Sequence, residues 1–154
     1  MEQSSNCYWK VSEVELIYKS KVDVSDRPCI TKSRDGFELF SESWNDGKID
    51  FVEQFKIALF NKANKVLGLF EVSSGGVSGT VADPKLIFAA ALKANASAIL
   101  LCHNHPSGNL KPSDADRNLT AKLVAAGRVL DIAVLDHIIL TRVSYFSFAD
   151  EGLL

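Results

Sequence analysis

Two apolar runs place the strongest limits on the fold of this chain. Residues Ala98–Cys102 are apolar throughout, Ile132–Leu140 are largely apolar, and a stretch with helical periodicity separates them. A short run of this kind is typical of a strand that is buried on both faces of a sheet. Strands that alternate with helices in this way predict a layered α/β domain, in which helices sandwich a mixed β-sheet.

Shorter patterns supply the remaining elements. Asp83-Pro84 predicts the start of a helix, because aspartate caps a helix and proline suits its first position. We expect a strand over 11–24, a helix from about 33 to 45 with Ser33 as its N-cap, a hairpin over 49–72, helices over 83–94 and 113–130, and an edge strand over 145–148. We assign residues 1–30 to an N-terminal extension with a strand and residues 31–154 to the folded domain.

Composition excludes several classes of protein. The formal net charge of the 154 residues is -2, which argues against a dedicated nucleic-acid-binding protein with a basic face. No apolar run approaches the roughly 18 residues of a membrane span, and the N-terminus has no apolar signal region, so we expect a cytoplasmic location. The three cysteines are widely spaced without a C-x-x-C pair, which favours free thiols over a cysteine-based zinc site.

The chemistry of the chain is concentrated after the first apolar run. His103 and His105 stand two residues apart at the end of the expected strand, so both imidazoles can lie on one face and reach one ion. Asp116 follows in the first turn of the next helix, and the intervening loop can bring it back to the histidines. Two imidazoles and one carboxylate suit Zn²⁺ and leave a fourth position for water, as in catalytic zinc sites.

A simpler interpretation of the same residues needs no metal. Ser113-x-x-Asp116 also fits a capping box, which alone could explain both residues. The two interpretations are compatible, because the Asp116 carboxylate has two oxygens. A His-x-His pair is weak evidence by itself, and the added serine and aspartate at fixed spacing strengthen the metal hypothesis.

The complete pattern resembles a known family. His103-x-His105, seven residues, Ser113, two residues and Asp116 resemble the JAMM motif of MPN-domain zinc hydrolases, and the strings 103–108, 134–139 and 147–152 resemble the RadC branch. This resemblance covers about residues 30–154 and implies an MPN/JAMM, cytidine-deaminase-like architecture. It also implies Zn²⁺ as cofactor and hydrolysis of amide or isopeptide bonds in a peptide or protein. The helix-hairpin-helix region of full-length RadC proteins is not in this sequence, so we expect no direct nucleic-acid binding.

The resemblance further implies an upstream glutamate as general base. Glu53 and Glu71 both lie in strand-like runs, and either one could simply face solvent on an amphipathic strand. We favour Glu53, which precedes His103 by 50 residues, a spacing similar to that of the family. Glu53 would take a proton from zinc-activated water and return it to the leaving amine, while Ser113 would hydrogen-bond the developing oxyanion.

Several alternatives stay open at this point. We interpret His137 as a core histidine with a hydrogen-bond partner, and an outer position around the metal is the alternative. The chain could instead be a non-catalytic accessory module linked to DNA repair or mobile elements through a protein partner, although the complete ligand set argues against that. A zinc deaminase would require His-x-Glu and Pro-Cys-x-x-Cys, which this sequence lacks. The sequence leaves open whether the protein forms a homodimer.

Overall fold

A five-stranded mixed sheet forms the centre of the molecule. The computed structural model describes residues 12, 14–15, 17–75 and 81–154. The strands lie in the order β2-β1-β3-β4-β5, and only β3 and β4 among these neighbours run parallel. Their bounds are β1 Gln54–Phe60, β2 Val66–Ser74, β3 Ala98–Asn104, β4 Ala133–Leu140 and β5 Tyr145–Ser147. The predicted mixed α/β architecture is therefore confirmed.

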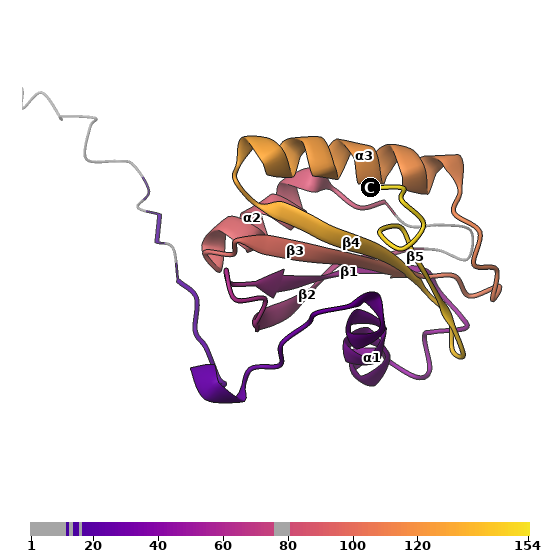
Figure 1. The fold of residues 1–154 in the computed structure, drawn as a ribbon, viewed down its shortest axis with the longest axis horizontal. Helices are drawn as coiled ribbons and strands as arrows, with labels where there is room; N and C mark the ends of the chain where they lie inside the picture. Colours follow the sequence, from indigo (N-terminus) through magenta and orange to yellow (C-terminus); the bar gives the residue numbers. More distant parts are fainter. Residues whose placement is uncertain (1–11, 13, 16, 76–80) are drawn as a thin grey trace, which may run out of the picture.

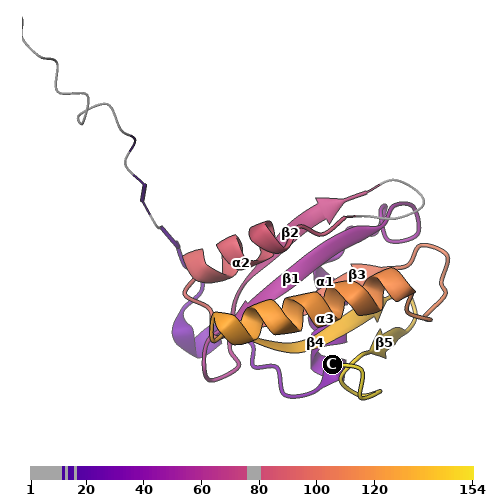
Figure 2. The same ribbon diagram turned by 90° about the horizontal axis from the view of Figure 1, so that it is seen from above.

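Helices cover both faces of the sheet. Helix α1 (Ser33–Ser43) lies against one face, and α2 (Pro84–Lys93) and α3 (Asp114–Val129) lie against the other (Figures 1 and 2). Each face has its own apolar core, with Ile87 and Leu123 on the α2/α3 side and Phe40 on the α1 side. The sheet is thus sandwiched between helices, as the two apolar runs predict.

Strands β1 and β3 are buried along their whole length. Their side chains alternate between the two cores, because successive residues of a strand point to opposite faces. Leu101 packs on the α2/α3 side and Cys102 on the α1 side. This alternation turns His103 toward α3, whereas Cys102 faces the opposite side of the sheet.

A glycine sets how closely α3 approaches the rest of the fold. A Cβ atom on Gly127 would lie 2.3 Å from the carbonyl oxygen of Ile132. The last turn of α3 therefore packs directly on the backbone that leads into β4. This contact fixes the position of α3 over the sheet and, with it, the helix start that carries Asp116.

The N-terminal extension differs from the prediction. The described residues between 12 and 23 form no strand, a short 3-10 helix (η2) spans Val24–Asp26, and residues 11, 13 and 16 lie outside the described part. The residues of 17–24 are all exposed, and none of them pairs with a strand of the sheet. The extension still contacts the sheet, because the Tyr18 hydroxyl donates to the main-chain carbonyl of Leu67 in β2 and Cys29 forms an isolated bridge with Lys65.

Two helix and strand boundaries also differ. Ser33 is the first residue of α1 and not its N-cap, because the Asp35 carboxylate accepts the Thr31 and Lys32 amides at 2.9 and 3.2 Å. Strand β1 begins at Gln54, so Glu53 stands just before the strand instead of inside it. Asp83 caps α2 through the amide of Lys85 at 2.9 Å, as predicted.

Two further expectations can be compared with the described residues. Both cysteines within them, Cys29 and Cys102, are free thiols. No helix built from this part of the chain is long and apolar enough to cross a membrane.

Candidate metal centre

Two histidine side chains meet at the carboxyl end of β3. His103 belongs to the strand and is only 1% exposed, and His105 follows just beyond its end. Their Nε2 atoms lie 3.0 Å apart. The two-residue spacing has therefore placed both imidazoles on one face, the face covered by α3.

The start of α3 brings Asp116 to the same point. Ser113 is the N-cap: its Oγ accepts the Asp116 amide at 3.1 Å, and Asp116 Oδ2 accepts the Ser113 amide at 2.7 Å. Asp116 Oδ1 also lies 3.3 Å from His103 Nε2, and Oδ2 lies 3.7 Å from His105 Nε2. One carboxylate thus completes the predicted capping box and faces both histidines.

The three side chains could hold one metal ion. Each offers one ligand atom, and these atoms lie within 4.8 Å of one another. The side chains of His105 and Asp116 keep 15% exposure, whereas His103 closes the inner side of the cluster. The candidate centre therefore has a buried wall and an opening toward solvent.

Electrostatics keep the carboxylate ionised. Burial alone would raise the pKa of Asp116, but the adjacent His103 and His105 rings, which can donate to it only in their protonated form, outweigh burial and hold that pKa well below its usual range. Burial would also lower the pKa of His105, yet the Asp116 carboxylate, the Asn109 carbonyl and the charge of Glu53 raise it. The cluster thus pairs an ionised carboxylate with two imidazole rings.

The outer nitrogen of His105 has a defined partner. Its Nδ1 lies 2.5 Å from the carbonyl oxygen of Asn109. A carbonyl can only accept a hydrogen bond, so Nδ1 carries the hydrogen. In the neutral imidazole the Nε2 lone pair therefore points into the cluster, where a metal would need it.

His137 is the inner neighbour of His103. It is fully buried, and its Nε2 lies 2.8 Å from His103 Nδ1, which confirms the predicted core histidine with a hydrogen-bond partner. Its Nδ1 lies 2.6 Å from the hydroxyl of Thr120 on α3. Burial and the nearby His103 lower the pKa of His137 well below its usual value, so this ring is neutral at neutral pH.

The β-sheet register separates the two candidate glutamates. Phe55 pairs with His103 at the last printed position of this ladder, and Glu53 stands two residues before it, close enough for its charge to raise the pKa of His105. Glu71 pairs with Lys56, and its carboxylate accepts Gln54 Nε2 at 3.0 Å on the α1 face. The structure therefore brings Glu53, and not Glu71, toward the histidines.

Asn104 is a residue that the sequence reasoning missed. It stands between the two histidines, is fully buried, and points to the opposite face. Its Oδ1 accepts the Gln54 amide at 2.7 Å, and its Nδ2 donates to the carbonyls of Ile49 and Val52 at 2.7 and 2.9 Å. Asn104 thus ties the end of β3 to the segment that carries Glu53. The signal available in the sequence was the position of this polar residue at the end of a run predicted to be a buried strand.

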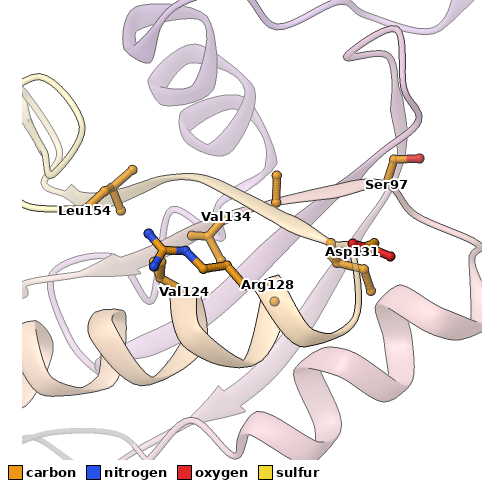
Figure 3. Close-up of a pocket in the computed structure, with 9 residues that line it drawn as sticks. Ser97, Val124, Arg128, Asp131, Val134 and Leu154 are labelled. Carbon is orange, nitrogen blue, oxygen red and sulfur yellow. The ribbon is translucent and has the colours of Figure 1, made fainter.

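A separate hollow lies at the other end of α3. It is lined by Ser97, Arg128, Val134 and Leu154 among others, at the amino ends of β3 and β4 (Figure 3). The candidate metal centre stands at the opposite, carboxyl end of β3. The hollow is therefore a different place from the histidine cluster.

Comparison with known proteins agrees with this geometry. The model of the RadC-like JAB domain matches residues 30–153. This chain belongs to the RadC-like JAB domain family. The resemblance that the motif carries is thereby confirmed, and the UPF0758 proteins are relatives of this RadC-like domain.

Three relatives illustrate the extent of the similarity. A UPF0758 protein of Flavobacterium johnsoniae is 42% identical over 144 residues, which are 93% of this chain and 62% of the relative. Those of Porphyromonas gingivalis and Clostridium kluyveri are 41% and 38% identical over 83% and 94% of this chain. They are covered over 56% and 61% of their own length. This RadC-like chain thus spans less than two thirds of these curated relatives.

Proposed function

We propose that this RadC-like JAB domain is a zinc-dependent metallohydrolase that cleaves amide or isopeptide bonds in a peptide or protein. The observation that carries the proposal is the convergence of His103 Nε2, His105 Nε2 and an Asp116 oxygen within 4.8 Å. Two imidazoles and one carboxylate are ligands that zinc accepts, and three protein ligands leave a position open for chemistry.

The donor atoms themselves support a cation at this point. The Nε2 atoms of His103 and His105 are 3.0 Å apart, and the hydrogen of the neutral His105 ring is used by Asn109. A lone pair that faces another ring nitrogen this closely, beside an ionised carboxylate, is stabilised by a metal ion or by a proton. The fit of the residues to zinc is therefore chemical as well as geometric.

The residues around the cluster can supply the remaining steps. Zinc, when bound, supplies the Lewis acidity that acidifies water and polarises a carbonyl oxygen. Glu53, whose charge acts on His105, accepts the proton of the attacking water and donates it to the leaving nitrogen. The Ser113 hydroxyl accepts the Asp116 amide, so its own hydrogen is free to stabilise the developing oxyanion.

The opening of the cluster fits a macromolecular substrate. His105 and Asp116 are partly exposed near the carboxyl end of β3, so a peptide bond can approach from solvent without unfolding any element. The substrate proposed here is a peptide or protein segment, recognised at this edge.

The test combines metal analysis with a peptide-library cleavage assay on untagged protein. We expect one equivalent of zinc in wild type and in Glu53→Gln, and none in His103→Ala. Cleavage should be seen in wild type and in the matched control Glu71→Gln, and be lost in Glu53→Gln. Full activity of Glu53→Gln would remove Glu53 from this role. Identical zinc content and cleavage in wild type and His103→Ala would reject the hydrolase.

A further inference from the structure

A circuit of hydrogen bonds, open at the metal centre, joins two of the proposed metal ligands through residues that would not touch the metal. His103 Nδ1 lies 2.8 Å from His137 Nε2, and His137 Nδ1 lies 2.6 Å from Thr120 Oγ1. Thr120 Oγ1 in turn lies 2.6 Å from the main-chain carbonyl of Asp116. The circuit therefore runs from β3 through β4 to α3 and returns to the residue that supplies the carboxylate.

We propose that Thr120 and His137 are positioning residues that fix His103 in the tautomer whose Nε2 lone pair faces the metal centre. This inference rests on the proposed function, because it gives these residues the role of orienting a zinc ligand. It adds two members to that site beyond the motif of histidines, serine and aspartate.

The direction of the circuit follows from its oxygen–oxygen contact. Two oxygens 2.6 Å apart repel unless a hydrogen lies between them, and the Asp116 carbonyl has none to give. The single hydrogen of the Thr120 hydroxyl must therefore point at that carbonyl, four residues back along α3. This leaves Thr120 Oγ1 as an acceptor toward His137.

The tautomers of both rings are then determined in turn. His137 must carry its hydrogen on Nδ1 in order to donate to Thr120, so its Nε2 in the neutral ring is an acceptor. His103 must consequently donate from Nδ1 to His137, which leaves the His103 Nε2 lone pair directed at His105 and Asp116. An outer partner that fixes a ligand imidazole in this way is a general feature of metal-binding histidines.

Aromatic packing holds the circuit in place. The Phe55 ring stacks on His103 with centroids 5.9 Å apart and planes 2° from parallel, and Phe148 stacks on His137 at 4.8 Å and 16°. Both imidazoles are thereby kept from turning over. Thr120 itself is 1% exposed, so water does not compete for its hydroxyl.

The test reads the tautomers directly in metal-free protein. The chain has only three histidines, so a long-range ¹H–¹⁵N spectrum of chelator-treated protein near pH 8 resolves each ring. We expect His103 and His137 as Nδ1–H tautomers, which is the minor form in free histidine. A wild-type His103 in the Nε2–H form would overturn the proposal, with no variant required.

A matched pair of variants then tests the role of Thr120. Thr120→Val keeps the shape but removes the acceptor, so the His103 signals should move toward the Nε2–H form and zinc affinity should fall by roughly 10–100-fold. Thr120→Ser keeps the hydroxyl and should retain the wild-type tautomer and affinity. If folded Thr120→Val kept the wild-type His103 tautomer and zinc affinity, the proposed positioning role of Thr120 would be overturned. Correct tautomers without any zinc binding would instead reject the proposed function alone.

Discussion

Asp136 and His137 are neighbours on β4, yet they belong to two different buried polar networks. Both are buried, with exposures of 5% and 0%, and strand alternation sends them to opposite faces of the sheet. Asp136 accepts Ser147 Oγ at 2.5 Å, the His137 amide at 2.7 Å and the Ala149 amide at 2.8 Å. His137 instead connects Thr120 to His103 and thus to the candidate metal centre.

The two networks end differently. Apart from the main-chain amide of His137, the donors to Asp136 lie on β5 and the segment after it, and each of them has its acceptor within the fold. The network of His137 ends on nitrogen and oxygen acceptors that face one another at the partly exposed cluster. Because buried polar groups are normally paired, a network that ends on mutually facing acceptors indicates a site for a ligand, whereas a closed one indicates stability.

Breaking the open network at the metal gives the largest expected effect. Asp116→Asn keeps an acceptor for the Ser113 amide but loses the charge, so zinc affinity should fall by more than about 100-fold, beyond the usual effect of residues that only orient a ligand. The melting temperature of the metal-free protein should change little. Zinc titration against a competing chelator measures the loss. Asp114→Asn in the same helical turn is the matched control, and an equal loss there would contradict a specific role for Asp116.

Breaking the closed network should cost stability and spare the metal. Asp136→Ala leaves the buried Ser147 hydroxyl and the Ala149 amide without their acceptor, so unfolding free energy should fall by about 2–4 kcal/mol. Urea unfolding measures this change, and Asp150→Ala, which removes only an exposed hydrogen bond to Ser33, is the control. A parallel loss of zinc affinity in folded Asp136→Ala would show that the two networks are not separate.

Asn104 sharpens the comparison between the two networks. All its hydrogen bonds end within the fold, yet they hold the segment that carries Glu53. Asn104→Ala should lower unfolding free energy by about 1–3 kcal/mol, since the Gln54 amide loses its acceptor. Hydrolysis should fall more than zinc affinity, because the variant loosens the segment that carries Glu53. Zinc titration and the cleavage assay on the same preparation separate the two effects. A loss confined to zinc affinity would contradict this assignment.

The smallest expected effect is a pH dependence from the closed network. Burial raises the pKa of Asp136, outweighing hydrogen bonds that oppose it, so the folded protein holds this proton more tightly than the unfolded chain. The resulting stabilisation is full below the unfolded pKa of about 4 and is lost as pH rises through the raised value. Asp136→Asn should therefore flatten this part of the stability profile in chemical unfolding. An unchanged slope would show that Asp136 does not titrate there.

The sequence predicts those elements and site residues whose position depends on the spacing of nearby residues along the chain. His103, His105, Ser113 and Asp116 follow from a two-residue strand repeat and a helix start, which depend on neighbours along the chain. The buried strands can likewise be predicted, because their apolar composition is a local property of the sequence. The candidate ligands could therefore be named before any three-dimensional information.

The parts that the sequence does not predict depend on long-range contacts. His137 meets His103 across 34 residues, and Asn104 meets Ile49 across 55. The choice between Glu53 and Glu71 depends on the register of β1 against β2 and β3, which neither run of residues specifies by itself. The expected strand in the extension was wrong over its described residues, because an alternating pattern forms a strand only where a neighbouring strand pairs with it.

X-ray absorption at the zinc edge of the loaded protein tests the central claim most directly. The proposed site predicts one bound zinc with two imidazole nitrogens at about 2.0–2.1 Å and oxygen for the remaining ligands. His105→Ala should remove the signal of one imidazole or abolish binding. Sulfur scattering at about 2.3 Å, or protein that retains no zinc after loading, would contradict a centre built from His103, His105 and Asp116.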